Sequence, residues 1–249
     1  MRRKIAAGNW KMNGNQSHLV QLASLAAQHP APKVDVVICP PTTLITRAYQ
    51  RIYDTPLSLG AQDCHAAAKG AHTGDVSAKM LTDAGAEYVL VGHSERRADH
   101  NETSSAVCAK AQAALDAGLV AIICIGETLD QRQAGNTLQV VAKELRQSVP
   151  ETATGKNVVI AYEPVWAIGT GKVATTEQIG EVHGFLRTQL QDRFGNQRGT
   201  DFRLLYGGSV KAVNATKIFA VNNVDGALVG GASLKSEDFS PIITALEAS

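Results

Sequence analysis

The sequence predicts an α/β protein built as a single (β/α)8 barrel, also called a TIM barrel, on three observations. Short apolar runs alternate with longer helix-forming segments from one end of the chain to the other. Most runs are continuously apolar, as in parallel strands that are buried on both faces. Eight such runs in 249 residues give about 31 residues per strand–helix unit, the size of one βα repeat. No low-complexity tract or Gly/Ser linker interrupts the chain, so residues 1–249 are expected to form one domain.

The predicted elements follow from these runs and from local start signals. The strands cover Lys4–Asn9, Val34–Cys39, Leu57–Gln62, Tyr88–Gly92, Val120–Ile125, Val158–Ala161, Arg203–Tyr206 and Gly226–Val229. The helix-forming segments include Ser17–Gln28, Glu102–Ala117, Asn136–Ser148, Thr176–Gln191 and Ser236–Glu247. Thr176 is the predicted N-cap of its helix, because a Thr hydroxyl can accept a first-turn N–H. Thr42, after Pro40-Pro41, is a further predicted helix start.

A doubly wound parallel sheet is the alternative arrangement of the same units. A dinucleotide-binding sheet of that kind carries a G-x-G-x-x-G turn after its first strand, and no such turn follows Lys4–Asn9. This absence weakens the dinucleotide-binding version of the alternative.

The composition is that of a globular protein with a sizeable core. Hydrophobic residues make up 44% and charged residues 19% of the chain, a normal mix. The formal charge of +1 excludes a strongly basic nucleic-acid footprint. No apolar run approaches the roughly 18 residues of a membrane span, and Asn9, Lys11 and Asn13 interrupt the stretch where a signal peptide would need its apolar core. A cytoplasmic location is therefore expected, with no nucleic-acid partner and no membrane partner.

The cysteines and histidines give no sign of a metal or redox centre. The four cysteines contain no C-x-x-C pair, and the seven histidines contain no H-x-H or H-x-x-x-H pair. Cys39 and Cys124 lie in predicted strands, where a free thiol behaves as a small buried hydrophobe. No metal ion is expected.

Reactive or conformationally permissive residues stand where the predicted strands end. In a parallel barrel the carboxyl ends of all strands converge on one mouth, where chemistry is expected. The residues in question are Asn9-Trp10-Lys11, Gln62-Asp63, Gly92-His93-Ser94-Glu95, Gly126-Glu127, Glu163, Gly207-Gly208-Ser209 and Gly230-Gly231.

Three of these residues are candidates for catalysis. Glu163 ends an apolar strand before Pro164, and a base at a dry rim and a carboxylate in a structural ion pair are equally open readings. His93 taken alone is more typical of a structural histidine. It precedes a helix-start pattern, however, whose positive end disfavours an imidazolium. Lys11 directly follows the first strand and is a candidate to meet an anion.

The glycine pairs after the last two strands predict a phosphate site. Two glycines let the backbone approach a ligand closely and present N–H groups, with a helix N-terminus behind them. Barrels of this kind bind phosphate after strands seven and eight. A pair of ordinary tight turns is the alternative.

An apolar loop with glycines at its tip follows Glu163 and has the composition of a lid that closes as a rigid piece. Its residues are Pro164, Val165, Trp166, Ala167, Ile168, Gly169, Thr170, Gly171, Lys172, Val173 and Ala174.

Five of these segments together resemble the triosephosphate isomerase family. The resemblance runs from Lys4 to about Ala245, with the motifs in family order. The motifs are Gly8-Asn9-Trp10-Lys11-Met12-Asn13, Gly92-His93-Ser94-Glu95-Arg96-Arg97, Ala161-Tyr162-Glu163-Pro164-Val165-Trp166-Ala167-Ile168-Gly169-Thr170-Gly171, Tyr206-Gly207-Gly208-Ser209-Val210 and Val229-Gly230-Gly231-Ala232-Ser233-Leu234.

The resemblance implies an isomerase of glycolysis and gluconeogenesis that interconverts dihydroxyacetone phosphate and glyceraldehyde 3-phosphate through an enediolate. It implies that Glu163 is the base, that His93 polarises the carbonyl, and that Lys11 holds the anionic substrate. Asn9 would hydrogen-bond to the reacting oxygens, and Glu95 would support Lys11. Backbone N–H groups would bind the phosphate at Gly169, Ser209, Gly230 and Gly231. The family needs neither a metal nor an organic cofactor, so none is expected.

The family works as a homodimer, and the loop around Thr73 resembles the one that reaches into the neighbouring subunit. The family commonly has Glu where Asp75 stands. A shorter carboxylate puts in doubt the reach of an ion pair there, for instance to Arg96, but does not affect the catalytic set.

Two other functions stay open on the sequence. One is a lyase or synthase that acts on a different sugar phosphate, which would keep the paired glycines but would not need Glu163, His93 and Lys11 together. The other is a catalytically silent homologue that binds ligands or partners, which would have lost at least one of these residues. None is lost.

Overall fold

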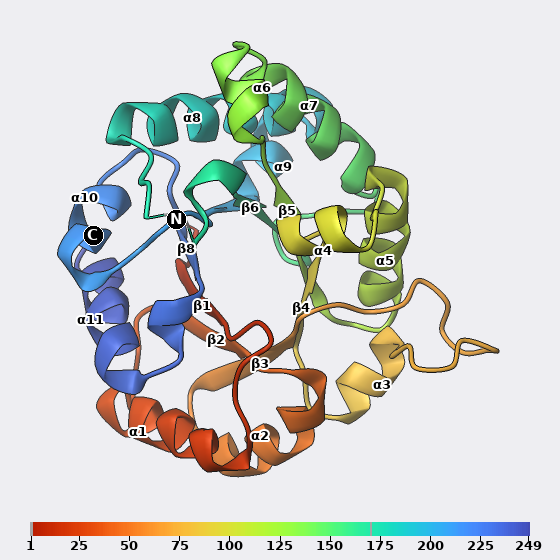
Figure 1. Cartoon of the computed structure of the whole chain (residues 1–249), viewed down its shortest axis with the longest axis vertical. Coiled ribbons are helices and arrows are strands. Elements are labelled where there is room, and N and C mark those ends of the chain that lie inside the picture. Colours follow the sequence, from red (N-terminus) through yellow and green to blue (C-terminus); the bar gives the residue numbers. More distant parts are fainter. Residues whose placement is uncertain (1, 170) are drawn as a thin grey trace.

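The computed structural model, which describes residues 2–169 and 171–249, is a closed barrel of eight parallel strands surrounded by helices (Figure 1). Each strand pairs with the next along the chain, and β1 also pairs with β8 to close the ring. The predicted fold class is confirmed. The strands are β1 (Ile5–Asn9), β2 (Asp35–Cys39), β3 (Leu57–Ala61), β4 (Tyr88–Val91), β5 (Val120–Ile125), β6 (Val158–Tyr162), β7 (Arg203–Tyr206) and β8 (Gly226–Val229).

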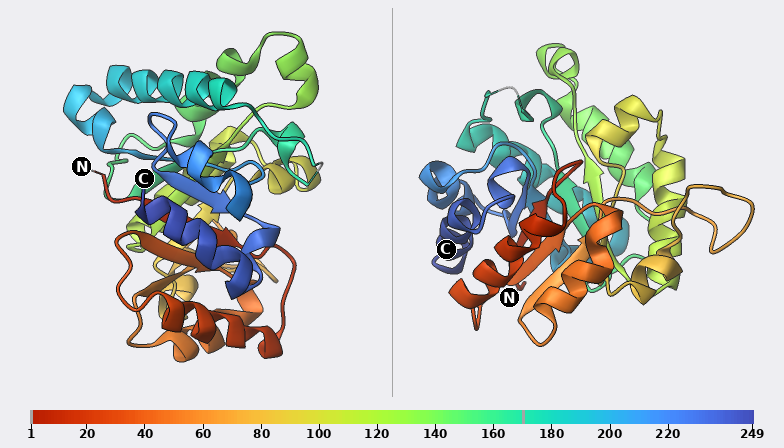
Figure 2. Two further views of the ribbon diagram at one scale, coloured as in Figure 1. Left: turned by 90° about the vertical axis from the view of Figure 1, so that its left-hand side faces the viewer. Right: turned by 60° about the horizontal axis from the view of Figure 1, so that its bottom comes forward.

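Helices connect the strands and form the outer layer of the barrel, as the two side views also show (Figure 2). The α-helices are α1 (Val20–Gln28), α2 (Ile45–Ile52), α3 (Ala78–Asp83), α4 (Ser94–Asp99), α5 (Ser104–Asp116), α6 (Leu129–Gln133), α7 (Thr137–Ser148), α8 (Thr176–Phe194), α9 (Asn196–Asp201), α10 (Ala212–Phe219) and α11 (Ser236–Glu247). Four 3-10 turns in the described residues are η1 (Gln16–Leu19), η2 (Thr42–Leu44), η3 (Val165–Ala167) and η4 (Gly231–Ser233).

The strands separate two apolar cores, which explains their continuous hydrophobicity. In β4, Leu90 packs inside the barrel with residues such as Ile122 and Val159. Its neighbours Val89 and Val91 point the other way and join the larger core between the strands and the helices. Because successive side chains of a strand alternate between its two faces, a strand with apolar layers on both sides is apolar at most of its positions.

The predicted N-cap of α8 is wrong by one position. Thr175, and not Thr176, caps the helix: its hydroxyl accepts the N–H of Gln178 at 3.3 Å, and the Gln178 side chain accepts the Thr175 N–H at 3.0 Å. This reciprocal capping box satisfies two backbone donors that the helix itself leaves free. Thr175 and Thr176 carry the same capping group, a hydroxyl. Thr175 is the cap because Gln178 stands three residues after it and can complete the capping box.

One segment stands away from the barrel. It connects β3 to α3 and protrudes at the right of Figure 1. We refer to residues 62–77 as the protruding segment; most of its side chains between residues 66 and 75 are exposed. None of the helices in residues 2–169 and 171–249 is long and apolar enough to cross a membrane.

Candidate active site

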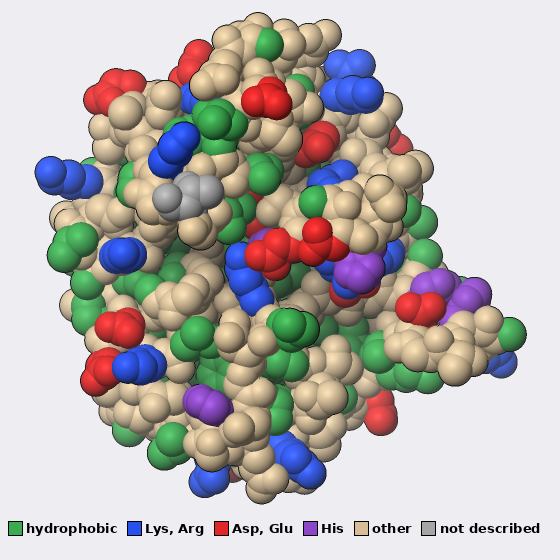
Figure 3. All heavy atoms as spheres, viewed as in Figure 1, with side chains coloured by type: hydrophobic (Ala, Val, Ile, Leu, Met, Phe, Trp, Pro, Cys, Tyr) green, Lys and Arg blue, Asp and Glu red, His purple; other side chains and the backbone are tan. Residues whose placement is uncertain are grey.

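A cavity of about 720 Å³ opens where the strands end, and it collects the residues that the sequence singled out. Its lining includes Asn9, Lys11, His93 and Glu163. These residues end or follow β1, β4 and β6, so they meet because parallel strands end at one rim of the barrel. In the space-filling view this face is hollowed near its centre, and acidic and basic side chains gather at the hollow (Figure 3).

Glu163 directly follows β6 and both of its carboxylate oxygens are engaged. Oε1 lies 2.9 Å from Nε2 of His93, and Oε2 accepts the backbone N–H of Ser94 at 2.9 Å. The Glu163 residue is only 2% exposed and His93 only 5%. Of the two readings that the sequence left open for Glu163, the ion pair is therefore present, but its partner is the other candidate catalytic residue.

His93 is the N-cap of α4, and its ring is fixed at both nitrogens. Nδ1 accepts the N–H of Glu95 at 3.2 Å, so this nitrogen carries no proton. The ring proton consequently belongs on Nε2, which faces Glu163 and the cavity. This arrangement holds the histidine in the neutral tautomer that can donate a hydrogen bond into the site.

The pair Glu163–His93 perturbs the pKa of both partners. Burial raises the pKa of the Glu163 carboxyl, but His93, the Ser94 N–H and Lys11 lower it by more, so that the net shift is downward. Burial lowers the pKa of the His93 imidazole, but the charge of Glu163 and then that of Glu95 raise it by more, so that the net shift is upward. The helix end was expected to disfavour an imidazolium, and the charge of Glu163 opposes that effect.

Lys11 is held in an unusual backbone conformation. Its φ of +53° lies in the left-handed region, which costs a non-glycine residue about 1–2 kcal/mol. Its N–H donates to Oδ1 of Asn9 at 3.0 Å, and its Nζ lies 2.5 Å from Oε1 of Glu95. The structure thus places Glu95 beside Lys11, although Glu95 does not line the cavity.

The predicted phosphate-binding residues line the same cavity. Ser209, Gly230 and Gly231 all line this cavity. Gly231 also begins the turn η4, and the first N–H groups of a helical turn have no partner within the turn and can bind a ligand. The glycine before this set, Gly207, has a second role: a Cβ there would lie 2.8 Å from Cγ of Glu163. Any side chain at Gly207 would displace the candidate base.

A sequence profile of the triosephosphate isomerase family matches residues 4–246, nearly the whole chain. The chain belongs to the triosephosphate isomerase family. It is 63% identical over 247 residues to the triosephosphate isomerase of Ruegeria pomeroyi, covering 99% of this chain and 98% of that protein. It is 62% identical over 249 residues to that of Ruegeria sp. strain TM1040, covering the whole of both. The crystal structure of the Bartonella henselae triosephosphate isomerase superposes with a TM-score of 0.92 at 45% identity, covering 99% of this chain and 100% of that one.

As in the family pattern, a candidate lid leaves the barrel directly after Glu163. It begins with η3, and Gly169 beyond this turn lines the cavity. Gly169 and Gly171 have φ angles of +69° and +80°, which glycine adopts without strain. Thr170 lies outside the described residues. The lid is buried at Pro164, Ala167 and Ala174, half-buried at Val165, Trp166 and Ile168, and exposed at Gly169, Gly171, Lys172 and Val173.

Glu127 anchors the start of this lid, a role that the sequence did not indicate. The carboxylate is fully buried, and its Oε1 accepts hydrogen bonds from Trp166 Nε1 at 2.9 Å, Tyr162 Oη at 3.1 Å and Arg132 at 2.7 Å. Its place at the end of β5 was the only signal in the sequence. Neither Tyr162 nor Arg132 carried a signal of this contact, which brings side chains from β6 and α6 to the same carboxylate oxygen.

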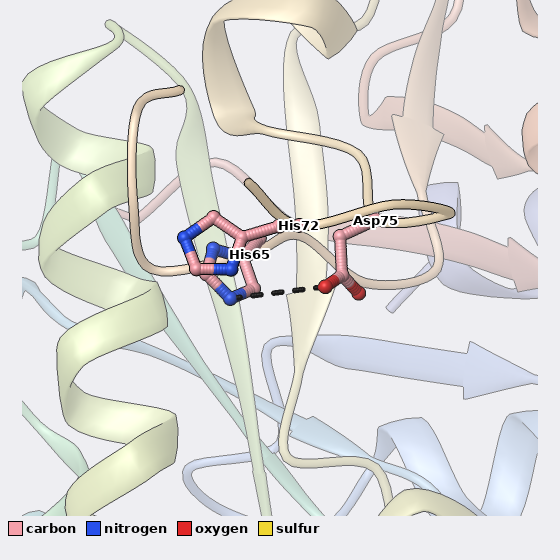
Figure 4. Close-up of side chains that lie close together, drawn as sticks. All are labelled: His65, His72 and Asp75. Carbon is pink, nitrogen blue, oxygen red and sulfur yellow. Dashed lines mark ion pairs between the residues drawn. The ribbon is translucent and has the colours of Figure 1, made fainter. Parts of the chain in front are cut away.

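A second cluster lies in the protruding segment, where His65, His72 and Asp75 bring their ligand atoms within 4.8 Å of one another (Figure 4). His65 Nε2 lies 3.9 Å from Asp75 Oδ2, and the two imidazole rings stack with centroids 4.1 Å apart. Nδ1 of His65 accepts the N–H of Ala67 at 3.0 Å, which leaves the ring proton on Nε2. The atom that faces Asp75 therefore offers a proton rather than a lone pair, and the cluster braces the segment.

Proposed function

We propose that this chain interconverts dihydroxyacetone phosphate and glyceraldehyde 3-phosphate as a single (β/α)8 domain. The observation that supports it most is the pair of Glu163 and His93, 2.9 Å apart and almost fully buried. A buried carboxylate beside a neutral imidazole that can donate a hydrogen bond suits the removal of a proton from a carbon next to a carbonyl group. Membership of the triosephosphate isomerase family supports the identity of the substrate.

In the proposed reaction, Glu163 takes a proton from one carbon of the triose and returns it to the neighbouring carbon. A carbon acid beside a carbonyl is too weak to lose its proton unless the developing oxyanion is stabilised. Nε2–H of His93, the side chain of Asn9 and the ammonium of Lys11 supply donors and positive charge where that oxyanion forms. His93 then passes a proton between the two oxygens, which completes the isomerisation without net gain or loss of protons.

Substrate binding changes the partner of both catalytic groups. In the structure the Nε2–H of His93 is directed at Glu163. A bound carbonyl oxygen takes that donor, and the carboxylate turns to the carbon. Once separated from Glu163, the imidazole loses the largest influence that raises its pKa, and the Glu95 N–H at Nδ1 keeps it neutral.

The phosphate of the substrate binds at Ser209, Gly230 and Gly231, which line the cavity. Gly169 adds its N–H when the lid closes. Closure also excludes water, which strengthens the electrostatic interactions in the site and protects the enediolate. Glu95 holds the ammonium of Lys11 in place by their contact of 2.5 Å.

We also propose that the chain forms a homodimer through the loop around Thr73. The exposure of the protruding segment and its projection from the barrel (Figure 1) support this proposal. The cytoplasmic location expected from the composition stays a prediction.

The test is an assay of glyceraldehyde 3-phosphate formation with the parent, His93→Gln and Lys11→Met. We expect His93→Gln to lower kcat with little change in KM, because the imidazole acts on the developing oxyanion. Lys11→Met should raise KM and lower kcat, because its charge attracts an anion that is present in the ground state and grows in the transition state. Inactivity of the parent, or a histidine variant that loses mainly binding, would contradict the proposal.

A further inference from the structure

We propose that Gln62 is a positioning residue for Lys11, and this inference rests on the proposed contact of Lys11 with the substrate. Gln62 directly follows β3 and does not line the cavity, so it has no direct access to the reacting atoms. Its effect on the reaction passes through the backbone of Lys11.

The side-chain amide of Gln62 joins the ends of three neighbouring strands. Nε2 donates to the carbonyl oxygen of Lys11 at 2.8 Å and to that of Cys39 at 2.9 Å. Cys39 is the last residue of β2, and Lys11 lies two residues beyond the end of β1. A primary amide has two N–H donors, and both are used here.

Lys11 needs such a partner because it has left the strand ladder. The pairing of β1 with β2 ends at Asn9 and Cys39, so neither the N–H nor the carbonyl of Lys11 has a ladder partner. Asn9 Oδ1 accepts the N–H, and Gln62 donates to the carbonyl. Together the two side chains bind both polar backbone groups of a residue whose φ is +53°.

The chemistry of this position favours glutamine. The two acceptors are carbonyl oxygens, so the group between them must donate twice. A lysine or arginine could also donate, but it would place a second positive charge beside Lys11. Glu95 holds the ammonium end of the Lys11 side chain, and Gln62 holds the backbone from which that side chain extends.

Two variants of equal length separate donation from space filling. Gln62→Met keeps the volume and removes both donors, whereas Gln62→Glu places an acceptor against two carbonyl oxygens at neutral pH. We expect kcat/KM to fall by about tenfold in Gln62→Met, with KM raised and kcat lowered as in Lys11→Met, since a misplacement of 1 Å can cost up to about 100-fold. Gln62→Glu should lose more. The matched control is Gln191→Met, which removes a half-buried amide that donates to Thr200 at 2.9 Å on α8.

The decisive measurement is a double-mutant cycle between Gln62→Met and Lys11→Met, with circular dichroism on every variant. If Gln62 acts through Lys11, its substitution changes kcat/KM in the parent background and leaves it nearly unchanged in the Lys11→Met background. Either Gln62 variant serves for the cycle, so the misfolding of one leaves the test intact.

The outcomes distinguish this inference from the proposed function. A loss of activity in Lys11→Met together with normal kinetics in both Gln62 variants would overturn the inference alone. An equal loss from Gln62→Met in both backgrounds would also overturn it, because the effect would then not depend on Lys11. Full activity in Lys11→Met would instead refute the role of Lys11 and with it the proposed function.

Discussion

At the scale of single residues, Glu163 and His93 influence each other's charge state. The carboxylate is almost inaccessible to water, and the imidazole and the Ser94 N–H keep its pKa below the ordinary value in spite of burial. In its proposed role as the base, Glu163 is already ionised and needs no proton to be removed before the substrate arrives. In that role its position decides the rate, because the carboxylate must reach a carbon atom of the substrate.

Glu163→Asp should therefore retain the fold and lose most of the activity. The shorter side chain withdraws the carboxylate by about 1 Å, which can cost on the order of 100-fold in rate. Turnover and circular dichroism are measured together, with the exposed Glu181→Asp on α8 as the control for shortening a carboxylate elsewhere. Near-normal turnover of Glu163→Asp would exclude Glu163 as the base.

At the scale of elements, α8 shows how a helix buries two polar residues, His183 and Arg187, within an apolar stripe. Its buried positions recur at intervals of three and four residues, and His183 is one of them. Nδ1 of His183 is 3.0 Å from the carbonyl oxygen of Asn223, which requires a proton on Nδ1. Burial, only partly offset by this hydrogen bond, lowers the pKa of His183 to about 4.

This shift predicts a loss of stability in acid. The unfolded chain binds a proton at His183 below about pH 6.5, whereas the folded protein does so only near pH 4. The contribution is thus complete above pH 6.5 and declines as the pH falls toward 4, by at most about 1.4 kcal/mol per pH unit. The free energy of unfolding is measured in urea between pH 4.5 and 7.5 at one protein concentration.

The variant that tests the assignment is His183→Gln, which should be less stable than the parent at neutral pH. Its free energy of unfolding should also change less with pH, by the contribution of one titrating group. His100→Gln removes an exposed histidine and serves as the control. A pH dependence in His183→Gln identical to that of the parent would show that other groups cause the acid sensitivity.

At the scale of the whole molecule, the protruding segment is tied to the barrel at its base. Asp63 accepts hydrogen bonds from Lys110 at 2.8 and 2.9 Å and pairs with Arg96 of α4 at 2.9 Å. Arg96 also pairs with Glu102 at 2.7 Å. Arg96 is thus engaged within its own chain, while Asp75 faces His65, so docking of the segment does not have to depend on an Asp75–Arg96 ion pair between subunits.

If the segment docks into a second copy, replacing His72–Asp75 with a short Gly-rich turn should produce monomers with greatly reduced activity. The replacement leaves the ties of Asp63 at the base intact, so the barrel should fold. Sedimentation gives the oligomeric state, and the isomerase assay gives the activity. A Gly-rich replacement of the exposed turn at residues 53–56, at the amino end of the barrel, is the control. A fully active monomer would refute the proposed role of the loop.

The sequence determined the order and kind of most elements. No predicted strand differs by more than one residue at either end from the strand in the structure, because most strands end where an apolar run meets a polar residue or glycine. Helix ends were less certain, as the cap of α8 shows, since neighbouring residues can offer the same capping group. The motifs also identified many of the residues that line the cavity, such as Asn9, His93 and Ser209, because these stand at or just beyond strand ends.

Only the tertiary structure decided which of these groups bind one another. The pairs Glu163–His93 and Gln62–Lys11 join residues 70 and 51 positions apart, and no local pattern encodes their distances. The sequence predicted that a candidate base and a histidine lie at one mouth of the barrel. The neutral tautomer of His93, in contrast, follows from the N–H of Glu95 in α4, which donates to Nδ1. The physical reason is that strand pairing around a closed barrel sets these contacts, and a sequence pattern records only the strands.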